Sequence, residues 1–210
     1  STRFYLDNVY IGDEIVDTDA PAMTSITVVD ASTLTLTYSE PVTQLSAETL
    51  ANSSITPTIA ITSVVQNVAM PTSVQINLAA PLTNGSNYSL STTAIEDLFS
   101  NTSNLQSLSF DYLIAETPTL GDIVITEFFP DPSPSVGLPE FEFVEIHNLS
   151  NKIFNLNGWK LGDNATFGTI QNAWILPGEY KILCPVANIA SFPNSVGVVS
   201  FPSLNNTTDE

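Results

Sequence analysis

The sequence predicts an all-β protein made of two β-sandwiches in tandem, and three observations lead to this prediction. The apolar residues, 43% of the 210-residue chain, come in short β-branched runs that suit strands better than helices. Several of these runs alternate with polar residues, as half-buried strands do. Pro, Gly and Asn residues separate the runs at the spacing of a sandwich, and a chain of this length has room for two domains.

We divide the chain into three parts. Residues 1–20 are expected to contain the last strand of an upstream module, at 4–11, and then a linker. The alternative is that this strand adds to the next domain. Residues 21–116 are expected to form the first sandwich and residues 117–210 the second. A segment with Pro118 and Gly121 marks the boundary between them. We expect the chain to be a piece of a longer protein.

The first sandwich shows its strand pattern most clearly where Leu34, Leu36 and Tyr38 share one face and threonines the other. Further strands are predicted at residues 26–29, 59–61, 74–78, 88–90 and 108–112. A short helix or turn is expected at 45–52, with Ser46 as its N-cap. About seven strands in about 100 residues is the pattern of an immunoglobulin-like sandwich.

The second sandwich is predicted to be immunoglobulin-like as well. Its strands are expected at residues 123–128, 142–147, 159–161, 173–176, 180–183 and 198–201. These are fewer than the usual seven or more, so we expect this sandwich to be truncated at its C-terminus. An unpaired sheet edge would then invite self-association. The Pro- and Ser-rich loop at 130–140 is a candidate contact loop.

Several ordered motifs of the second sandwich resemble those of the lamin tail domain family. They are Ile-Thr-Glu ending at Glu127, Glu-Phe-Val-Glu from Glu142 to Glu145, Asn148, Leu-x-Gly-Trp-x-Leu with Gly158 and Trp159, Asp163, and a turn with Pro177 and Gly178. The resemblance covers about residues 119–210. It implies an immunoglobulin-like fold and, in bacteria, a module of secreted or membrane-associated proteins. It does not imply filament formation, because the chain has no heptad-bearing coiled coil.

The first sandwich resembles bacterial immunoglobulin-like domains of the surface-layer and adhesin type. Residues 34–42, 81–88 and 95–101 carry this more diffuse likeness. Such domains are usually strung together as spacers, so the resemblance implies a structural role for this half of the chain.

The charge of the chain limits its partners. Twenty-two acidic residues stand against 4 basic ones, for a formal net charge of −18. Nucleic-acid binding needs a basic face that releases counterions, so no nucleic-acid partner is expected. The chain has no apolar stretch long enough to span a bilayer, so direct membrane insertion is not expected either. High acidity suits an extracellular or cell-surface protein and divalent cations.

Calcium is the one metal that the sequence favours. Hard cations bind carboxylate and carbonyl oxygens supplied by loops, and Asp13, Glu14, Asp17 and Asp19 cluster in the linker. No EF-hand spacing is present. The alternative is a solvated acidic linker that binds no metal. No other cofactor is expected.

The sequence predicts no enzyme. Its only histidine, His147, is not accompanied by a Gly-x-Ser-x-Gly motif that would supply a nucleophilic serine. We interpret His147 as a surface or edge-strand residue. Glu127, Glu140 and Glu142 are the carboxylates best placed to converge for glycosidic chemistry, but the family resemblance argues against it. The single Cys184 cannot form an internal disulfide and is expected to be a buried core thiol.

These observations predict a non-catalytic segment of a larger secreted or cell-surface bacterial protein, which spaces, anchors or displays neighbouring domains. The alternative is an adhesion module, with or without a dependence on calcium, whose partner is a cell-surface polysaccharide or protein. The two tryptophans differ in this respect: Trp159 is expected to pack in the core, whereas Trp174 is freer to contact a ligand such as a sugar ring.

Overall fold

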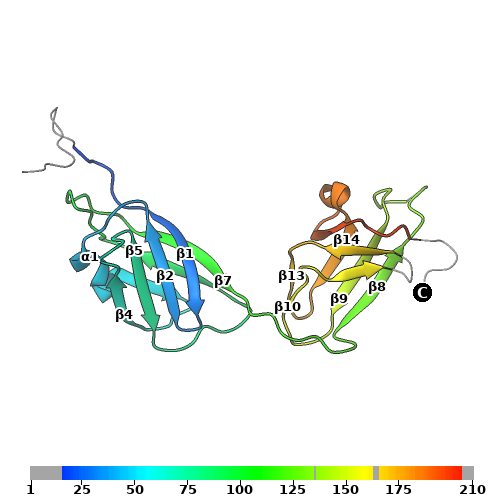
Figure 1. Ribbon diagram of the computed structural model, residues 1–210, viewed down its shortest axis with the longest axis horizontal. Coiled ribbons are helices and arrows are strands. Elements are labelled where there is room, and N and C mark those ends of the chain that lie inside the picture. Colours follow the sequence, from blue (N-terminus) through cyan, green and yellow to red (C-terminus); the bar gives the residue numbers. More distant parts are fainter. Residues whose placement is uncertain (1–15, 135, 163–165, 205–210) are drawn as a thin grey trace, which may run out of the picture. The chain divides into compact units, whose positions relative to one another are not determined.

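The computed structural model describes residues 16–134, 136–162 and 166–204, and it divides the chain into two compact units, Ser1–Tyr112 and Leu113–Glu210. Each unit is built from strands (Figure 1). Each also has its own apolar core. The predicted all-β class is therefore confirmed. The strand predicted at 4–11 lies outside the described residues. No helix in the described part of the chain is both long and apolar enough to cross a membrane.

The first unit packs two sheets face to face. One sheet has the order β1-β2-β5-β4 and the other β3-β6-β7. The strands are β1 (Met23–Asp30), β2 (Thr33–Tyr38), β3 (Ser53–Thr56), β4 (Ile61–Gln66), β5 (Ser73–Leu78), β6 (Ser86–Thr92) and β7 (Gln106–Tyr112). Alternation places Leu34, Leu36 and Tyr38 in the core, as predicted, where they meet Ile76 of β5 and Leu90 of β6.

Two short helices connect β2 to β3 in this unit. They are α1 (Gln44–Glu48) and the 3₁₀ helix η1 (Leu50–Asn52). The predicted N-cap, Ser46, is wrong: Thr43 caps α1, because its side-chain oxygen accepts the backbone N–H of Ser46. Ser46 instead lies inside α1, nearly buried, and its hydroxyl accepts the backbone N–H of Glu96 at 2.9 Å.

The second unit is organised around a six-stranded sheet of order β11-β12-β15-β14-β9-β8. Its strands are β8 (Ile123–Phe129), β9 (Phe143–Asn148), β11 (Lys160–Gly162), β12 (Phe167–Ile170), β14 (Tyr180–Pro185) and β15 (Ser195–Val199). A two-stranded sheet of β10 (Phe154–Asn155) and β13 (Trp174–Ile175) packs on one face through Phe154 and Ile175, which are fully buried. The prediction from sequence missed β10 and β12.

The opposite face of this sheet carries a smaller apolar cluster. The 3₁₀ helix η2 (Val186–Ser191) joins β14 to β15, which run parallel to each other. Beside it, Phe143, Cys184 and Phe192 are buried together. Burial in this cluster raises the pKa of the Cys184 thiol, against a smaller opposing effect of a hydrogen bond with Ser195. The prediction of a buried core thiol is confirmed.

Candidate functional site

The carboxylates that meet in the first unit are Asp17, Glu40 and Asp97. One oxygen from each lies within 4.8 Å of the other two. They come from three distant segments: the chain before β1, the turn after β2 and the loop between β6 and β7. Only Asp17 belongs to the predicted calcium set, because Asp19 is not part of this cluster and Asp13 and Glu14 lie outside the described residues.

Asp97 is the anchor of this cluster. It is 1% exposed, and its Oδ1 accepts the backbone N–H groups of Phe99 and Asn101 at 2.7 and 2.8 Å. The amide of Asn101 donates to Oδ2 at 2.7 Å. Burial alone would raise the pKa of the Asp97 carboxyl, but the hydrogen bonds from Asn101, Phe99 and Ser100 hold it below its ordinary value. Asp97 is therefore an ionised, buried carboxylate.

The pKa of Glu40 is shifted in the opposite direction to that of Asp97. Burial raises the pKa of its carboxyl, and the negative charges of Asp17, Asp97 and Asp19 add to the effect. Removing that repulsion is what a bound cation does. Hydrogen bonds from Phe99, Ser100 and Asn101 hold the Asp97 carboxylate in place, and Asp17 and Glu40 complete the group of oxygen atoms. The oxygen donors thus fit a hard cation such as Ca²⁺.

In the second unit, Asn148 joins the end of β9 to three neighbouring segments. It is fully buried, and its side-chain amide donates to the carbonyl oxygen of Lys152 at 2.7 Å. Its Oδ1 accepts the N–H and hydroxyl of Ser150. Its backbone N–H donates to Glu179 and its carbonyl accepts from Gly178. Asn148 therefore has a structural role.

The glycines of the family motifs sit in turns that need them. Gly158 and Gly178 have φ values of +82° and +74°, which favour glycine. Gly178 and Pro177 form the turn before β14, and Gly158 donates to the carbonyl of Ile170. Trp159 follows this turn and packs half-buried against Phe154, with ring centroids 6.0 Å apart. Asp163 lies outside the described residues.

The glutamates of the second unit do not gather into one site. Glu127 of β8 pairs directly with Glu145 of β9, whereas Glu142 precedes β9 and its Oε2 accepts the backbone N–H of Leu204 at 3.4 Å. Glu140 is exposed in the preceding loop. The predicted convergence of Glu127 with Glu140 and Glu142 finds no support in this pairing.

His147 was predicted to be a surface or edge-strand residue. It lies on β9, which has a strand on each side, so the edge-strand alternative is wrong, and the residue is half-buried. Its ring stacks on Tyr180 of β14, with centroids 3.8 Å apart and planes 6° from parallel. The two residues are cross-strand partners. This stacking gives His147 a packing role, and among the described residues no serine or cysteine is hydrogen-bonded to its ring.

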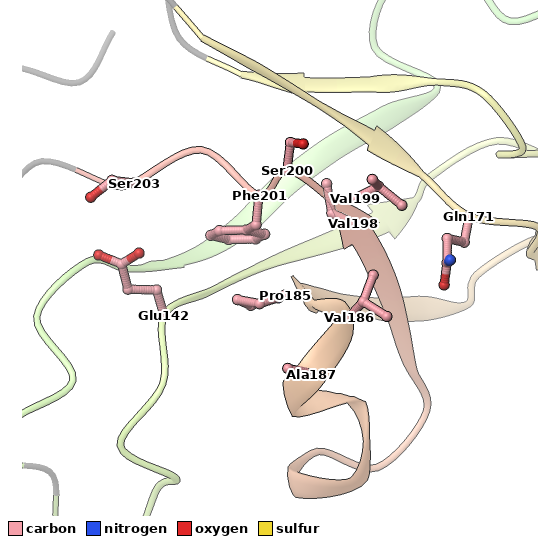
Figure 2. Close-up of a pocket in the computed structure, with 10 residues that line it drawn as sticks. All are labelled: Glu142, Gln171, Pro185, Val186, Ala187, Val198, Val199, Ser200, Phe201 and Ser203. Atoms are coloured by element: carbon pink, nitrogen blue, oxygen red, sulfur yellow. The ribbon is translucent and has the colours of Figure 1, made fainter.

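An open pocket of about 600 Å³ lies at one end of the six-stranded sheet. Figure 2 shows its apolar middle, formed by Phe201, Pro185 and Val186, with Glu142 at one end and Gln171 at the other. Trp174, the predicted ligand contact, is not among its lining residues: it is half-buried on β13 and pairs with Asn155 of β10. Sequence reasoning missed the pocket because its residues come from separated segments.

Comparison with known proteins concerns mainly the second unit. The family model described as Lamin Tail Domain matches residues 116–208. No curated protein sequence matches the chain.

Two solved structures are similar to the chain at low identity. "Structure of surface layer protein SbsC, domains 1-6" is 13% identical, with a TM-score of 0.42. The match covers 78% of this chain and 32% of the SbsC chain. "Crystal structure of the N-terminal part of the bacterial S-layer protein SbsC" is 15% identical, also with a TM-score of 0.42. The match covers 86% of this chain and 44% of that SbsC chain. The chain thus spans less than half the length of either structure, and such scores are too low to establish a shared fold. The family match, in contrast, confirms the predicted resemblance to the lamin tail domain for residues 116–208.

Proposed function

We propose that this chain is a non-catalytic structural and interaction segment of a larger secreted or cell-surface bacterial protein, in which it spaces, anchors or displays neighbouring domains. The observation that carries the proposal is the construction of the chain from two units in series, each with its own buried core. Units that bury their apolar residues separately fold without needing each other, as modules of a spacer must.

The connection between the units supports this role. Tyr112 ends β7 in the first unit. In the second unit, the backbone N–H of Glu116 already donates to the carbonyl oxygen of Ile153, and the Glu116 side-chain carboxylate accepts the backbone N–H of Ile153. Only Leu113, Ile114 and Ala115 lie between Tyr112 and Glu116. The two modules thus follow each other in the sequence with little chain between them, as in a string of spacer domains.

The chemistry of the side chains supports a non-catalytic role. Catalysis needs a nucleophile, a base and an orienting group within hydrogen-bond reach. Among the described residues, His147 stacks on Tyr180, and Cys184 is buried with a raised pKa. Glu127 lies within β8 opposite Glu145, whereas Glu142 precedes β9 and accepts a hydrogen bond from Leu204. A net charge of −18 keeps such a segment soluble and apart from its copies.

Two measurements on the full chain test this proposal. An antibody raised against the chain is expected to label intact cells that produce the parent protein, and labelling only after lysis would contradict a surface role. The purified chain is expected to hydrolyse no polysaccharide, peptide or phosphoester substrate. Hydrolysis that disappears in a Glu127→Gln or Glu142→Gln variant would establish an enzyme instead. A glycan array tests the alternative of carbohydrate binding through Trp174.

A calcium-stabilised first unit is a second candidate function, and the meeting of Asp17, Glu40 and Asp97 favours it. A cation that binds only the folded chain raises its stability by mass action. We expect millimolar calcium to raise the unfolding temperature of the first unit above that in chelator, with magnesium less effective.

The variant Glu40→Gln separates calcium binding from a general effect of salt. It is expected to lose most of the calcium response, whereas Asp30→Asn, at the far end of β1, is expected to keep it. An equal response of the two variants, or no response of the unchanged chain, would leave an acidic cluster that binds no metal.

A further inference from the structure

Strand β8 is an edge strand of the second unit. It pairs with β9 on one side, and none of the described strands pairs with its other side (Figure 1). The free side of an edge strand presents backbone N–H and C=O groups that another strand can bind. Partner proteins use such edges by adding an extended segment to the sheet.

The apolar core of the second unit reaches β8 at Ile123 but leaves two other apolar residues of this strand uncovered. Ile125 pairs with Ile146 and Phe128 with Val144, so each points to the same side of the sheet as its partner. Ile146 and Val144 are buried in the core, but Ile125 is 60% exposed and Phe128 is 42% exposed. An additional strand with apolar side chains on this side would extend the core and cover both residues.

The other side of β8 carries negative charge. Glu127 stands directly opposite Glu145, and the hydroxyl of Thr126 donates to Glu145 Oε1 at 2.6 Å, which keeps that carboxylate beside β8. Like charges in directly opposite positions destabilise a sheet. The ion pairs among the described residues, Lys152–Asp122 and Lys181–Glu179, neutralise other carboxylates.

We propose that β8 binds an extended segment of another protein in which apolar and basic residues alternate. Because side chains alternate across a strand, such a segment places its apolar residues over Ile125 and Phe128 and its lysines or arginines beside Glu127 and Glu145. This inference goes beyond the proposed spacer role, which stands without it.

A second copy of this chain is a poor occupant of the same edge. Pairing β8 with β8 would bring the glutamates of both copies together, and each copy carries a net charge of −18. The pairing register also shifts between Ile125 and Glu127, which marks a bulge at Thr126. Bulges and charges on an edge strand are features that oppose self-pairing.

The experiment measures binding of two fluorescent peptides to the full chain by anisotropy. One alternates valine and lysine, and the other alternates valine and glutamate. We expect the lysine peptide to bind at least about tenfold more tightly, with an affinity that falls as salt is raised from about 50 to about 500 mM. Backbone amide signals of β8 are expected to shift in NMR spectra of the complex.

Matched variants connect this binding to β8. Glu127→Lys is expected to weaken binding of the lysine peptide about fivefold or more, and Phe128→Ser is expected to weaken it about threefold. Two controls are expected to bind within about twofold of the unchanged chain. Asp111→Lys makes the same charge change on the edge strand β7 of the first unit. Leu149→Ser removes an apolar residue outside β8 that is more exposed than Phe128.

Three results would overturn the proposal. One is equal binding of the two peptides, or none at millimolar concentration. Another is a loss of binding in Asp111→Lys equal to that in Glu127→Lys, which would indicate attraction to the overall charge. The third is a chain that dimerises with protection of β8 amides, which would make a second copy the occupant.

Discussion

Asn148 shows how one polar residue can hold the loops of a sandwich together. Its buried amide satisfies backbone groups of Ser150, Lys152 and Ile175, which would otherwise lack partners in the core. The family motif marks this position in the sequence, but only the hydrogen bonds explain why asparagine stands there. A buried amide with both its N–H and C=O groups in use is costly to replace.

Replacing this residue by alanine is therefore expected to destabilise the second unit by about 3 kcal/mol, because several buried backbone groups lose a partner together. Denaturant unfolding followed by Trp159 and Trp174 fluorescence measures the change, since both tryptophans lie in this unit. The exposed Asn151 in the same loop provides the control, and Asn151→Ala is expected to cost less than about 0.5 kcal/mol. Equal effects of the two variants would contradict the structural role of Asn148.

Glu40 leads to a prediction about pH. Its pKa in the folded chain is raised above the ordinary value of 4.5 by burial and by the neighbouring Asp17 and Asp97. Its contribution to stability is thus fully present below pH 4.5 and is lost as the pH rises through the raised pKa. In chelator, Glu40→Gln is expected to be more stable than the unchanged chain at pH 7, and the difference should vanish near pH 4.

Denaturant unfolding of the first unit at several pH values measures this difference. The control Asp111→Asn removes the same charge from β7, away from Asp17 and Asp97, and should show no such pH-dependent gain. If Glu40→Gln were less stable than the unchanged chain at pH 7 in chelator, the repulsion inferred for this cluster would be wrong.

At the scale of elements, strands with clear alternation were predictable and short strands were not. The residues of β2 alternate strictly between buried core and half-buried positions, so six residues suffice to recognise the strand. Strand β12 contains only Phe167–Ile170, including Gly168, and its pattern is too short to distinguish from a loop. Its strand conformation comes from pairing with β11 and β15.

Gly168 is where β12 meets its neighbours most closely. A Cβ atom there would overlap the side chain of Val198 and would lie 2.9 Å from the carbonyl oxygen of Ser200. Val198 is buried and cannot move aside. Gly168→Ala is expected to destabilise the second unit by about 2–3 kcal/mol through overpacking.

The control for this prediction is Gly178→Ala. A Cβ atom at Gly178 has no atom within 4 Å, so its cost of about 1 kcal/mol comes from the positive φ alone. Thermal or denaturant unfolding measures both variants. A smaller loss for Gly168→Ala than for Gly178→Ala would mean that β12 and β15 do not approach as closely as described.

At the scale of the whole molecule, the chain consists of two units that bury different residues. Leu36 belongs to the core of the first unit and Leu183 to that of the second, and each is 1% exposed. Strands that pair across the sequence stay within their own unit, as the sheet orders show. Independent cores predict independent unfolding.

Leu36→Ala and Leu183→Ala in the full chain test this independence, and each serves as the control for the other. Each substitution leaves a cavity that costs about 2–5 kcal/mol in its own unit. Calorimetry is expected to show two transitions, with one lowered in each variant and the other unchanged. A shift of both transitions by a single substitution would show that the units are energetically coupled.

The sequence alone was sufficient for the all-β class, for most long strands and for the resemblance of the second unit to the lamin tail domain. These features depend on local patterns: alternation along a strand, glycine and proline at turns, and motifs in a fixed order. The burial of Cys184 was predictable for the same reason, because it ends an apolar run.

Contacts between distant segments were decided only by the tertiary structure. Asp17 lies two residues before Asp19 in the sequence, yet it meets Glu40 and Asp97, because sheet pairing brings three separate segments together. The pairing of Glu127 with Glu145 follows from a register that includes a bulge, which no local pattern reports. Alternation indicates which side of a strand an apolar residue occupies, but Ile125 and Phe128 are exposed because of where the neighbouring layer ends.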